Sequence, residues 1–128
     1  MLEVADLQKK LSKEEYRGVF PKLQERLRLL QYAARDAEVA TVIVLEGWDG
    51  SGRGNILKHL TQRLDPRLFR IYRGVAPSVL EQGYHFLWRY QTKLPDDGAI
   101  ALFDHAWYGR VLVERVDKLA PKKLWRQA

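Results

Sequence analysis

The feature that most constrains the fold is an apolar run that leads directly into a glycine-rich turn. The run Thr41-Val-Ile-Val-Leu-Glu46 is rich in β-branched residues and predicts a strand buried on both faces. The turn Gly47-Trp-Asp-Gly-Ser-Gly-Arg-Gly54 follows at once. Apolar residues at helical spacing come next and predict a helix that ends at Asp65-Pro66, with four side chains facing inward: Ile56, Leu57, Leu60 and Leu64.

The rest of the chain continues this alternation of strands and helices. Residues 68–73 and 99–104 predict two further strands. Between them, a capping box at Ser78 and Glu81 predicts a helix that runs to about Lys93, and another helix is expected from about Arg110. Strands that alternate with helices predict an α/β fold with a parallel sheet and helices on both faces.

The segment before the first strand is expected to be helical. Ser12 and Glu15 form a capping box, and an apolar stripe follows at helical spacing. Pro21 interrupts this stripe and predicts the start of a second helix, because proline disfavours helix in the residue before it. We therefore divide the chain into an N-terminal helical segment, residues 1–40, and a core of residues 41–128.

The net charge and the composition limit the classes of partner that this chain is expected to bind. The net charge of +6, from 22 basic and 16 acidic residues, favours an anionic partner: nucleic acid, acidic lipid or polyphosphate. No block of Lys and Arg resembles a nucleic-acid-binding tail, and no apolar run approaches the roughly 20 residues that cross a bilayer. The acidic N-terminus does not resemble a signal peptide, and the lack of cysteine fits a cytoplasmic protein.

The glycine-rich turn has the spacing G-x-x-x-x-G of a P-loop, in the required context between strand and helix. Glycines let successive backbone N–H groups point at phosphate oxygens, and the N-terminus of the following helix adds positive potential. The alternative is a glycine-rich strand–helix turn without a ligand. The candidate phosphate-binding residues are Gly47, Gly50, Ser51, Gly52, Arg53, Gly54 and Asn55.

Two positions depart from the general P-loop pattern. Arg53 stands where lysine normally reaches the terminal phosphates, and Gly54 stands where Ser or Thr normally holds magnesium. A magnesium ion therefore needs other ligands, and Asp49 and Asp104 are the candidates. Asp104 ends the third predicted strand, as a Walker B carboxylate does. The alternative for Asp104 is an aspartate that caps its loop.

Several motifs together resemble the polyphosphate kinase 2 family. Glu46-Gly-Trp-Asp49 and Gly52-Arg-Gly-Asn55 are similar to the Walker A segment of that family, and Phe103-Asp-His-Ala-Trp-Tyr-Gly-Arg110 is similar to its Walker B segment. The run Trp107-Tyr-Gly-Arg-Val-Leu-Val-Glu-Arg115 especially resembles polyphosphate:AMP phosphotransferases. The resemblance covers nearly the whole chain.

This resemblance implies a P-loop kinase-like fold similar to that of thymidylate kinases. It implies Mg²⁺-dependent transfer of a terminal phosphoryl group between inorganic polyphosphate and a nucleotide, AMP or ADP. The loop amides and Arg53 would hold a phosphate, Asp49 and Asp104 would hold magnesium and orient the acceptor, and Arg110 would supply a further cation. The resemblance leaves a homo-oligomer or a tandem sibling domain open, and it implies no nucleic-acid partner.

The chain also departs from the family pattern. The family usually has lysine at position 53 and Arg-Ser at positions 105 and 106, where this chain has Arg53, His105 and Ala106. Family members carry an arginine-bearing lid after the Walker B helix, so we expect the core to be incomplete at its C-terminus and the isolated chain to turn over no nucleotide. Two alternatives stay open: an ATP-dependent nucleoside monophosphate kinase, and a catalytically degenerate phosphate-binding half of a tandem polyphosphate kinase 2 protein.

Overall fold

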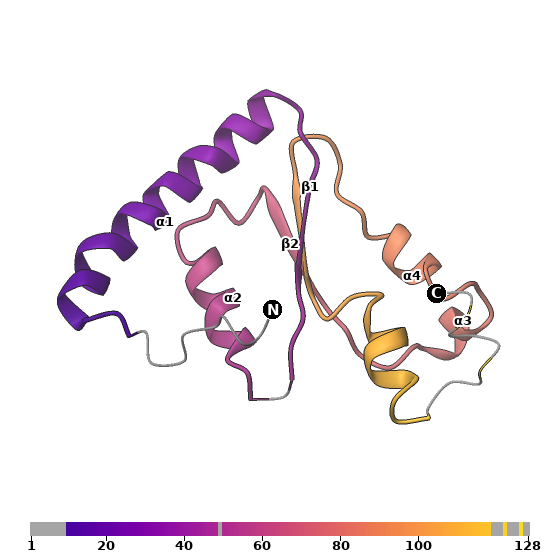
Figure 1. The fold of residues 1–128 in the computed structure, drawn as a ribbon. Coiled ribbons are helices and arrows are strands. Elements are labelled where there is room, and N and C mark those ends of the chain that lie inside the picture. Colours follow the sequence, from indigo (N-terminus) through magenta and orange to yellow (C-terminus); the bar gives the residue numbers. More distant parts are fainter. Residues whose placement is uncertain (1–9, 49, 119–121, 123–125, 127–128) are drawn as a thin grey trace.

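A three-stranded parallel sheet divides the helices into two groups (Figure 1). The computed structural model describes residues 10–48, 50–118, 122 and 126. The strands β1 (Thr41–Leu45), β2 (Phe69–Arg73) and β3 (Ile100–Asp104) are arranged in the order β1-β3-β2. In Figure 1 the helices α1 (Lys13–Asp36) and α2 (Arg53–Thr61) lie to one side of the sheet, and α3 (Val79–Gln82) and α4 (Trp88–Gln91) lie to the other. The α/β class that the sequence predicts is confirmed.

The core is centred on β3. Its residues from Ile100 to Phe103 are buried, and Leu102 and Phe103 have no exposed surface. The prediction that Thr41–Glu46 is buried on both faces was wrong: β1 is only partly buried, and Val42 is 39% exposed. The reason is the strand order, since β3 pairs on both sides whereas β1 lies at an edge of the described sheet.

The helix α1 is continuous, so the second helix predicted to begin at Pro21 does not exist. Proline inside a helix removes a hydrogen bond and costs about 3 kcal/mol. Tertiary and capping contacts offset this cost. The capping box of Ser12 and Glu15 fixes the first turn, and Phe20, next to Pro21, packs between Tyr16 and His59 of α2 at ring-centre distances of 4.8 and 5.2 Å.

Two buried glutamines attach α1 to the core. Gln24 donates from Nε2 to the carbonyl of His59 and to Oε1 of Gln62, both at 3.1 Å. Gln31 is 2% exposed, donates to the carbonyl of Asp65 at 3.1 Å and accepts from the Asp65 amide at 2.8 Å. Because buried polar groups need partners, these bonds fix α1 against α2 and the segment that follows it.

Three further helix predictions differ from the structure. The helix predicted from Ser78 to about Lys93 is broken after α3, where Gly83 follows the last helical residue, and glycine is a poor helix former. The helix predicted from Arg110 is the short π-helical segment η2 (Arg110–Glu114). In α2, Ile56 is 52% exposed rather than inward-facing. Pro121, where proline would favour the start of one more helix, lies outside the described residues.

We predict that Leu102→Ala destabilises the fold by about 2–5 kcal/mol, because it removes a fully buried side chain and leaves a cavity in the central strand. The matched control is Leu30→Ala on α1, where the side chain is 55% exposed and the expected loss is below about 1 kcal/mol. Urea unfolding of both variants measures the difference. Equal losses would contradict a core centred on β3.

Candidate functional site

The last residues of all three strands meet at one edge of the sheet. Asp104 ends β3, and its Cα is in register with Leu45 of β1 on one side and Arg73 of β2 on the other. Since ligands of open parallel sheets bind at the carboxyl ends of the strands, the loops that leave this edge form the candidate site. The glycine-rich turn after β1 and Asp104 therefore lie at the same edge.

The glycine-rich turn adopts a conformation that favours glycine. Gly50 and Gly52 have φ angles of 79° and 87°, in the left-handed region. A Cβ on Gly47 would lie 2.9 Å from Oγ of Ser51, so the Ser51 side chain would have to move to admit it. Gly52 is the N-cap of α2, and no described side chain caps this helix. The first-turn amides of α2 therefore face the turn without a capping side chain, which suits an anion.

Arg53 and Asp104 lie in direct contact. Nε of Arg53 donates to Oδ1 of Asp104 at 3.2 Å, and the two side chains are 15% and 22% exposed. The same guanidinium donates from Nη1 to the carbonyl of Gly47 and, at 3.4 Å, to that of Trp48. The structure thus brings two of the predicted site residues together. Asp49 and the side chain of Arg110 lie outside what the structure describes.

Glu46 joins the ends of β1 and β3, which the sequence did not predict. Its Oε1 accepts the amide of Ala106 at 2.7 Å, and its Oε2 lies 2.9 Å from Nδ1 of His105. His105 has a φ of 66°, a left-handed conformation that is strained for a non-glycine residue. Glu46 was visible as the last residue of the first predicted strand. Its partners depend on the register between strands, which the sequence does not reveal.

Gly74, the residue after β2, completes the edge. Its amide donates to the carbonyl of Asp104 at 2.7 Å. A Cβ on Gly74 would lie 2.4 Å from Cβ of His105 and 2.9 Å from its carbonyl oxygen. The loops after β2 and β3 therefore touch at a point where only glycine fits.

The residues at this edge supply some, but not all, of the ligands that a magnesium ion usually has. Magnesium is commonly held by one or two carboxylates together with substrate phosphates and water, and Asp104 supplies one carboxylate. Among residues 10–48 and 50–118, no three His, Asp or Glu side chains gather as a metal cluster. A cation at this edge would therefore depend on oxygens from a bound phosphate as well as on Asp104.

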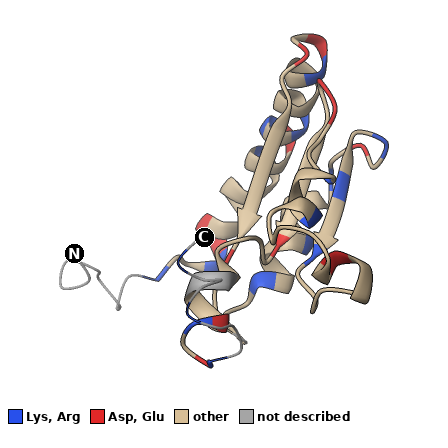
Figure 2. Cartoon of the chain, turned by 90° about the vertical axis from the view of Figure 1, so that its right-hand side faces the viewer, with Lys and Arg blue, Asp and Glu red and all other residues tan. Residues whose placement is uncertain are grey.

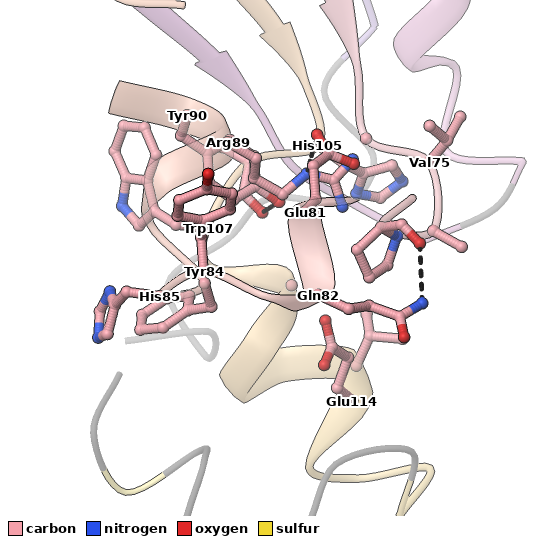
Figure 3. Close-up of a pocket in the computed structure, with 17 residues that line it drawn as sticks. Val75, Glu81, Gln82, Tyr84, His85, Arg89, Tyr90, His105, Trp107 and Glu114 are labelled. Carbon is pink, nitrogen blue, oxygen red and sulfur yellow. Dashed lines mark hydrogen bonds and ion pairs between the residues drawn. The ribbon is translucent and has the colours of Figure 1, made fainter. Parts of the chain in front are cut away.

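A pocket of about 850 Å³ adjoins this edge (Figure 3). Its lining includes Gly74, His105 and Ala106 from the strand ends. In Figure 3 the aromatic side chains of Tyr84, Tyr90 and Trp107 gather on one side, and Val75 and Gln82 lie on the other. Tyr90 donates its hydroxyl to the carbonyl of Ala106 at 3.1 Å. The pocket depends on how the chain folds back between α3 and α4, which the sequence does not reveal.

Arg89 and Glu81 form an ion pair in the pocket lining, and Glu114 lines the pocket as well. Arg89 is 9% exposed, and its Nε lies 3.4 Å from Oε1 of Glu81, which is also 3.7 Å from Nζ of Lys93. The Ser78 amide that donates to Glu81 holds the pKa of that carboxyl below its ordinary value, and the nearby charges of Arg89 and Lys93 lower it further. Glu81 thus carries a negative charge that offsets Arg89. The pocket combines aromatic walls with this ion pair and the carboxylate of Glu114.

Figure 2 shows Lys and Arg interspersed with Asp and Glu over several elements of the described chain. Within the described residues, no helix combines the length and the apolar character that crossing a membrane requires.

These features define an α/β protein of the P-loop phosphate-binding class: a strand, a glycine turn and an uncapped helix, with a carboxylate at the end of the adjacent parallel strand. A model of the family Polyphosphate kinase 2 (PPK2) matches residues 10–128. The chain belongs to the polyphosphate kinase 2 family.

Known proteins agree with this assignment. The chain is 37% identical over 128 residues to a polyphosphate:AMP phosphotransferase of Pseudomonas syringae pv. tomato, covering all of this chain and 26% of that protein. It is 40% identical over 114 residues to an ADP-polyphosphate phosphotransferase of Pseudomonas aeruginosa, covering 89% of this chain and 38% of that one. A crystal structure described as a polyphosphate kinase 2 of P. aeruginosa matches with a TM-score of 0.91 and 34% identity, over 98% of this chain and 28% of that chain. The chain thus spans about a quarter to two fifths of the length of these relatives.

We predict that Gly74→Ala destabilises the fold by about 1–3 kcal/mol, because the new Cβ would overlap His105 and displace the loop after β3. The matched control is Gly18→Ala in α1, where a Cβ meets nothing within 4 Å and better helix propensity adds up to about 1 kcal/mol. Thermal unfolding of both variants checks the prediction. A neutral Gly74→Ala would show that the two loops are not in contact.

Proposed function

We propose that the protein that contains this chain transfers a terminal phosphoryl group between inorganic polyphosphate and a nucleotide, AMP or ADP. The observation that carries the proposal is the glycine turn and α2 N-terminus beside Asp104, in a chain of the polyphosphate kinase 2 family. The names of the relatives, polyphosphate:AMP phosphotransferase and ADP-polyphosphate phosphotransferase, support this substrate pair.

The glycine turn is the proposed phosphate site. Its candidate residues run from Gly47 to Asn55, and their amides precede or begin α2. Phosphoryl transfer depends mainly on positioning and charge neutralisation, so backbone N–H groups and one guanidinium are suitable tools. Arg53 is the first residue of α2, next to the turn, and is the proposed side-chain cation for the phosphate. Arg110 is proposed as a further cation on the strength of the family resemblance.

The pocket in Figure 3 is the proposed place for the base and ribose of the nucleotide. Aromatic walls suit a purine ring, and about 850 Å³ is ample for a nucleoside. The lining carries the carboxylates of Glu81 and Glu114 beside the guanidinium of Arg89, so it has no excess positive charge to attract a polyanion. His105 lines the pocket and follows Asp104 in the chain, so a nucleoside in the pocket would direct its phosphate toward the glycine turn.

Mg²⁺ is the proposed cofactor, with Asp104 as one ligand and Asp49 as a second by family resemblance. When bound, the ion would neutralise charge on the phosphates and align them. Asp104 is suited to this role because it ends the buried central strand and is held in register between β1 and β2.

One observation favours a second candidate, a catalytically degenerate domain that binds phosphate beside an active sibling. Arg53 bonds to Asp104 and to the turn's own carbonyls, where the family usually has lysine. A phosphate site with this arrangement could bind an anion without transferring it. An ATP-dependent nucleoside monophosphate kinase is less well supported, because Arg53-Gly54 replaces the Lys-Ser/Thr pair of ATP-binding loops.

We predict that Asp104→Asn in the intact protein lowers transfer from polyphosphate to AMP or ADP at least about a hundredfold, roughly 3 kcal/mol of barrier. The matched control is Asp97→Asn, which changes an exposed aspartate in the turn before β3. A coupled assay of ADP and ATP formation measures both variants. Activity of Asp104→Asn within threefold of the parent would contradict the proposed role of Asp104 as a Mg²⁺ ligand. No transfer from polyphosphate by the parent protein would favour the degenerate domain.

We predict that Ala76→Trp raises the KM for the nucleotide about tenfold and leaves the KM for polyphosphate unchanged. Ala76 lines the pocket and is exposed, so an indole there narrows the pocket without entering the core. The control is Ala33→Trp, at an exposed position of α1. An equal rise in both KM values, or in neither, would place the nucleotide elsewhere.

A further inference from the structure

The bonds of Arg53 go to oxygens of the protein itself. Its Nε–H group donates to Oδ1 of Asp104 at 3.2 Å, and its Nη1 donates to the carbonyls of Gly47 and Trp48. The carbonyls belong to the glycine turn, and the carboxylate ends the neighbouring strand. One guanidinium thus ties the turn to the end of β3. A planar fork of donors can make these bonds together, whereas a lysine ammonium is a single point charge.

This contact lies where a divalent cation would bind. Mg²⁺ binds carboxylate oxygens at about 2.1 Å, so an ion on Oδ1 of Asp104 would lie within about 5 Å of the Arg53 nitrogen. Both side chains are largely buried, at 15% and 22% exposure, and water screens such a repulsion poorly. Arg53 and the cation therefore oppose each other at Asp104.

A phosphate in the glycine turn would change this balance. Guanidinium groups bind phosphate oxygens with strong, often paired hydrogen bonds. Arg53 is the first residue of α2, directly after the turn, so an anion in the turn competes with Asp104 for the same guanidinium. When Arg53 moves to the anion, the carboxylate of Asp104 is released for a cation.

We propose that Arg53 is the resting counter-ion of Asp104, and that this contact couples phosphate binding to divalent-cation binding. Without phosphate, Arg53 neutralises the carboxylate and cations bind weakly. With phosphate, Arg53 pairs with the anion and the cation site opens. By linkage, the cation raises the affinity for phosphate by the same factor. The inference rests on the proposed phosphate site and deepens it, because it assigns to this chain's arginine a role that a lysine would not perform.

The test measures binding rather than turnover. Mn²⁺ replaces Mg²⁺, and electron paramagnetic resonance counts the free ion, with and without inorganic phosphate. A protein-free blank corrects for association between Mn²⁺ and phosphate. In the intact parent protein, phosphate should raise the Mn²⁺ affinity about tenfold, within the usual range of coupling between sites.

The variants separate the contributions. Arg53→Gln should bind Mn²⁺ about tenfold more tightly than the parent without phosphate, and phosphate should then add little. Arg53→Lys should have a Mn²⁺ affinity between those of the parent and Arg53→Gln. It replaces Arg53→Gln in the test if that variant does not fold. Arg17→Gln, which removes an exposed charge from α1, should behave as the parent does. Asp104→Asn should abolish tight Mn²⁺ binding both in the parent and in the Arg53→Gln background.

The outcomes distinguish this inference from the proposed function. If Arg53→Gln and the parent bind Mn²⁺ equally without phosphate, Arg53 is not the counter-ion and the inference is overturned. Calorimetry with phosphate alone tests the phosphate site independently. Phosphate binding without any effect on Mn²⁺ would overturn the coupling and leave the proposed function standing. No phosphate binding by the parent would instead remove the proposed phosphate site.

Discussion

The pairing of β3 between two parallel neighbours is the constraint on which the site depends. Parallel pairing in register brings the carboxyl ends of β1, β2 and β3 to the same edge, so Asp104 lies between Leu45 and Arg73. Residues Ile100 to Phe103 are buried on both faces of β3, and a shift by one residue would place the Asp104 carboxylate among these buried positions, which is costly. The position of the carboxylate is therefore a consequence of core packing, not of the loop that follows it.

Glu46 connects the loops that leave this shared edge. It accepts the amide of Ala106 and contacts the ring of His105, so the start of the glycine turn is tied to the loop after β3. Gly74 adds the loop after β2 through its bond to the Asp104 carbonyl. The left-handed backbone of His105 costs on the order of 1 kcal/mol and persists because these contacts determine it. A change in any one loop is therefore felt by the other two.

The sequence predicted the parts of the fold that are encoded locally. Apolar runs located all three strands, and both capping boxes formed as expected. The failures came where tertiary contacts decide. Pro21 lies inside a continuous helix because tertiary packing, including that of Phe20, outweighs the local penalty of proline. The strand β1 is partly exposed because it lies at an edge of the described sheet, and the sequence of one strand does not reveal the strand order. In the site, glycine spacing located the turn and the strand end located Asp104. The bonds of Arg53 and Glu46 required the register between strands, and the pocket required the fold of α3 and α4.

The glycine turn and the pocket differ in the charges that they present, and this difference affects where the anionic end of a substrate would bind. The glycine turn offers backbone amides and a guanidinium whose partners can be exchanged for an anion. In the pocket, Arg89 is held by Glu81, whose own negative charge is stabilised by the Ser78 amide. A phosphate in the pocket would meet the carboxylates of Glu81 and Glu114 beside one arginine, whereas the turn adds backbone amides to its guanidinium. The anionic end of a substrate is thus favoured at the turn and disfavoured in the pocket. This difference in charge would orient a nucleotide in addition to any contact between the aromatic walls and its base.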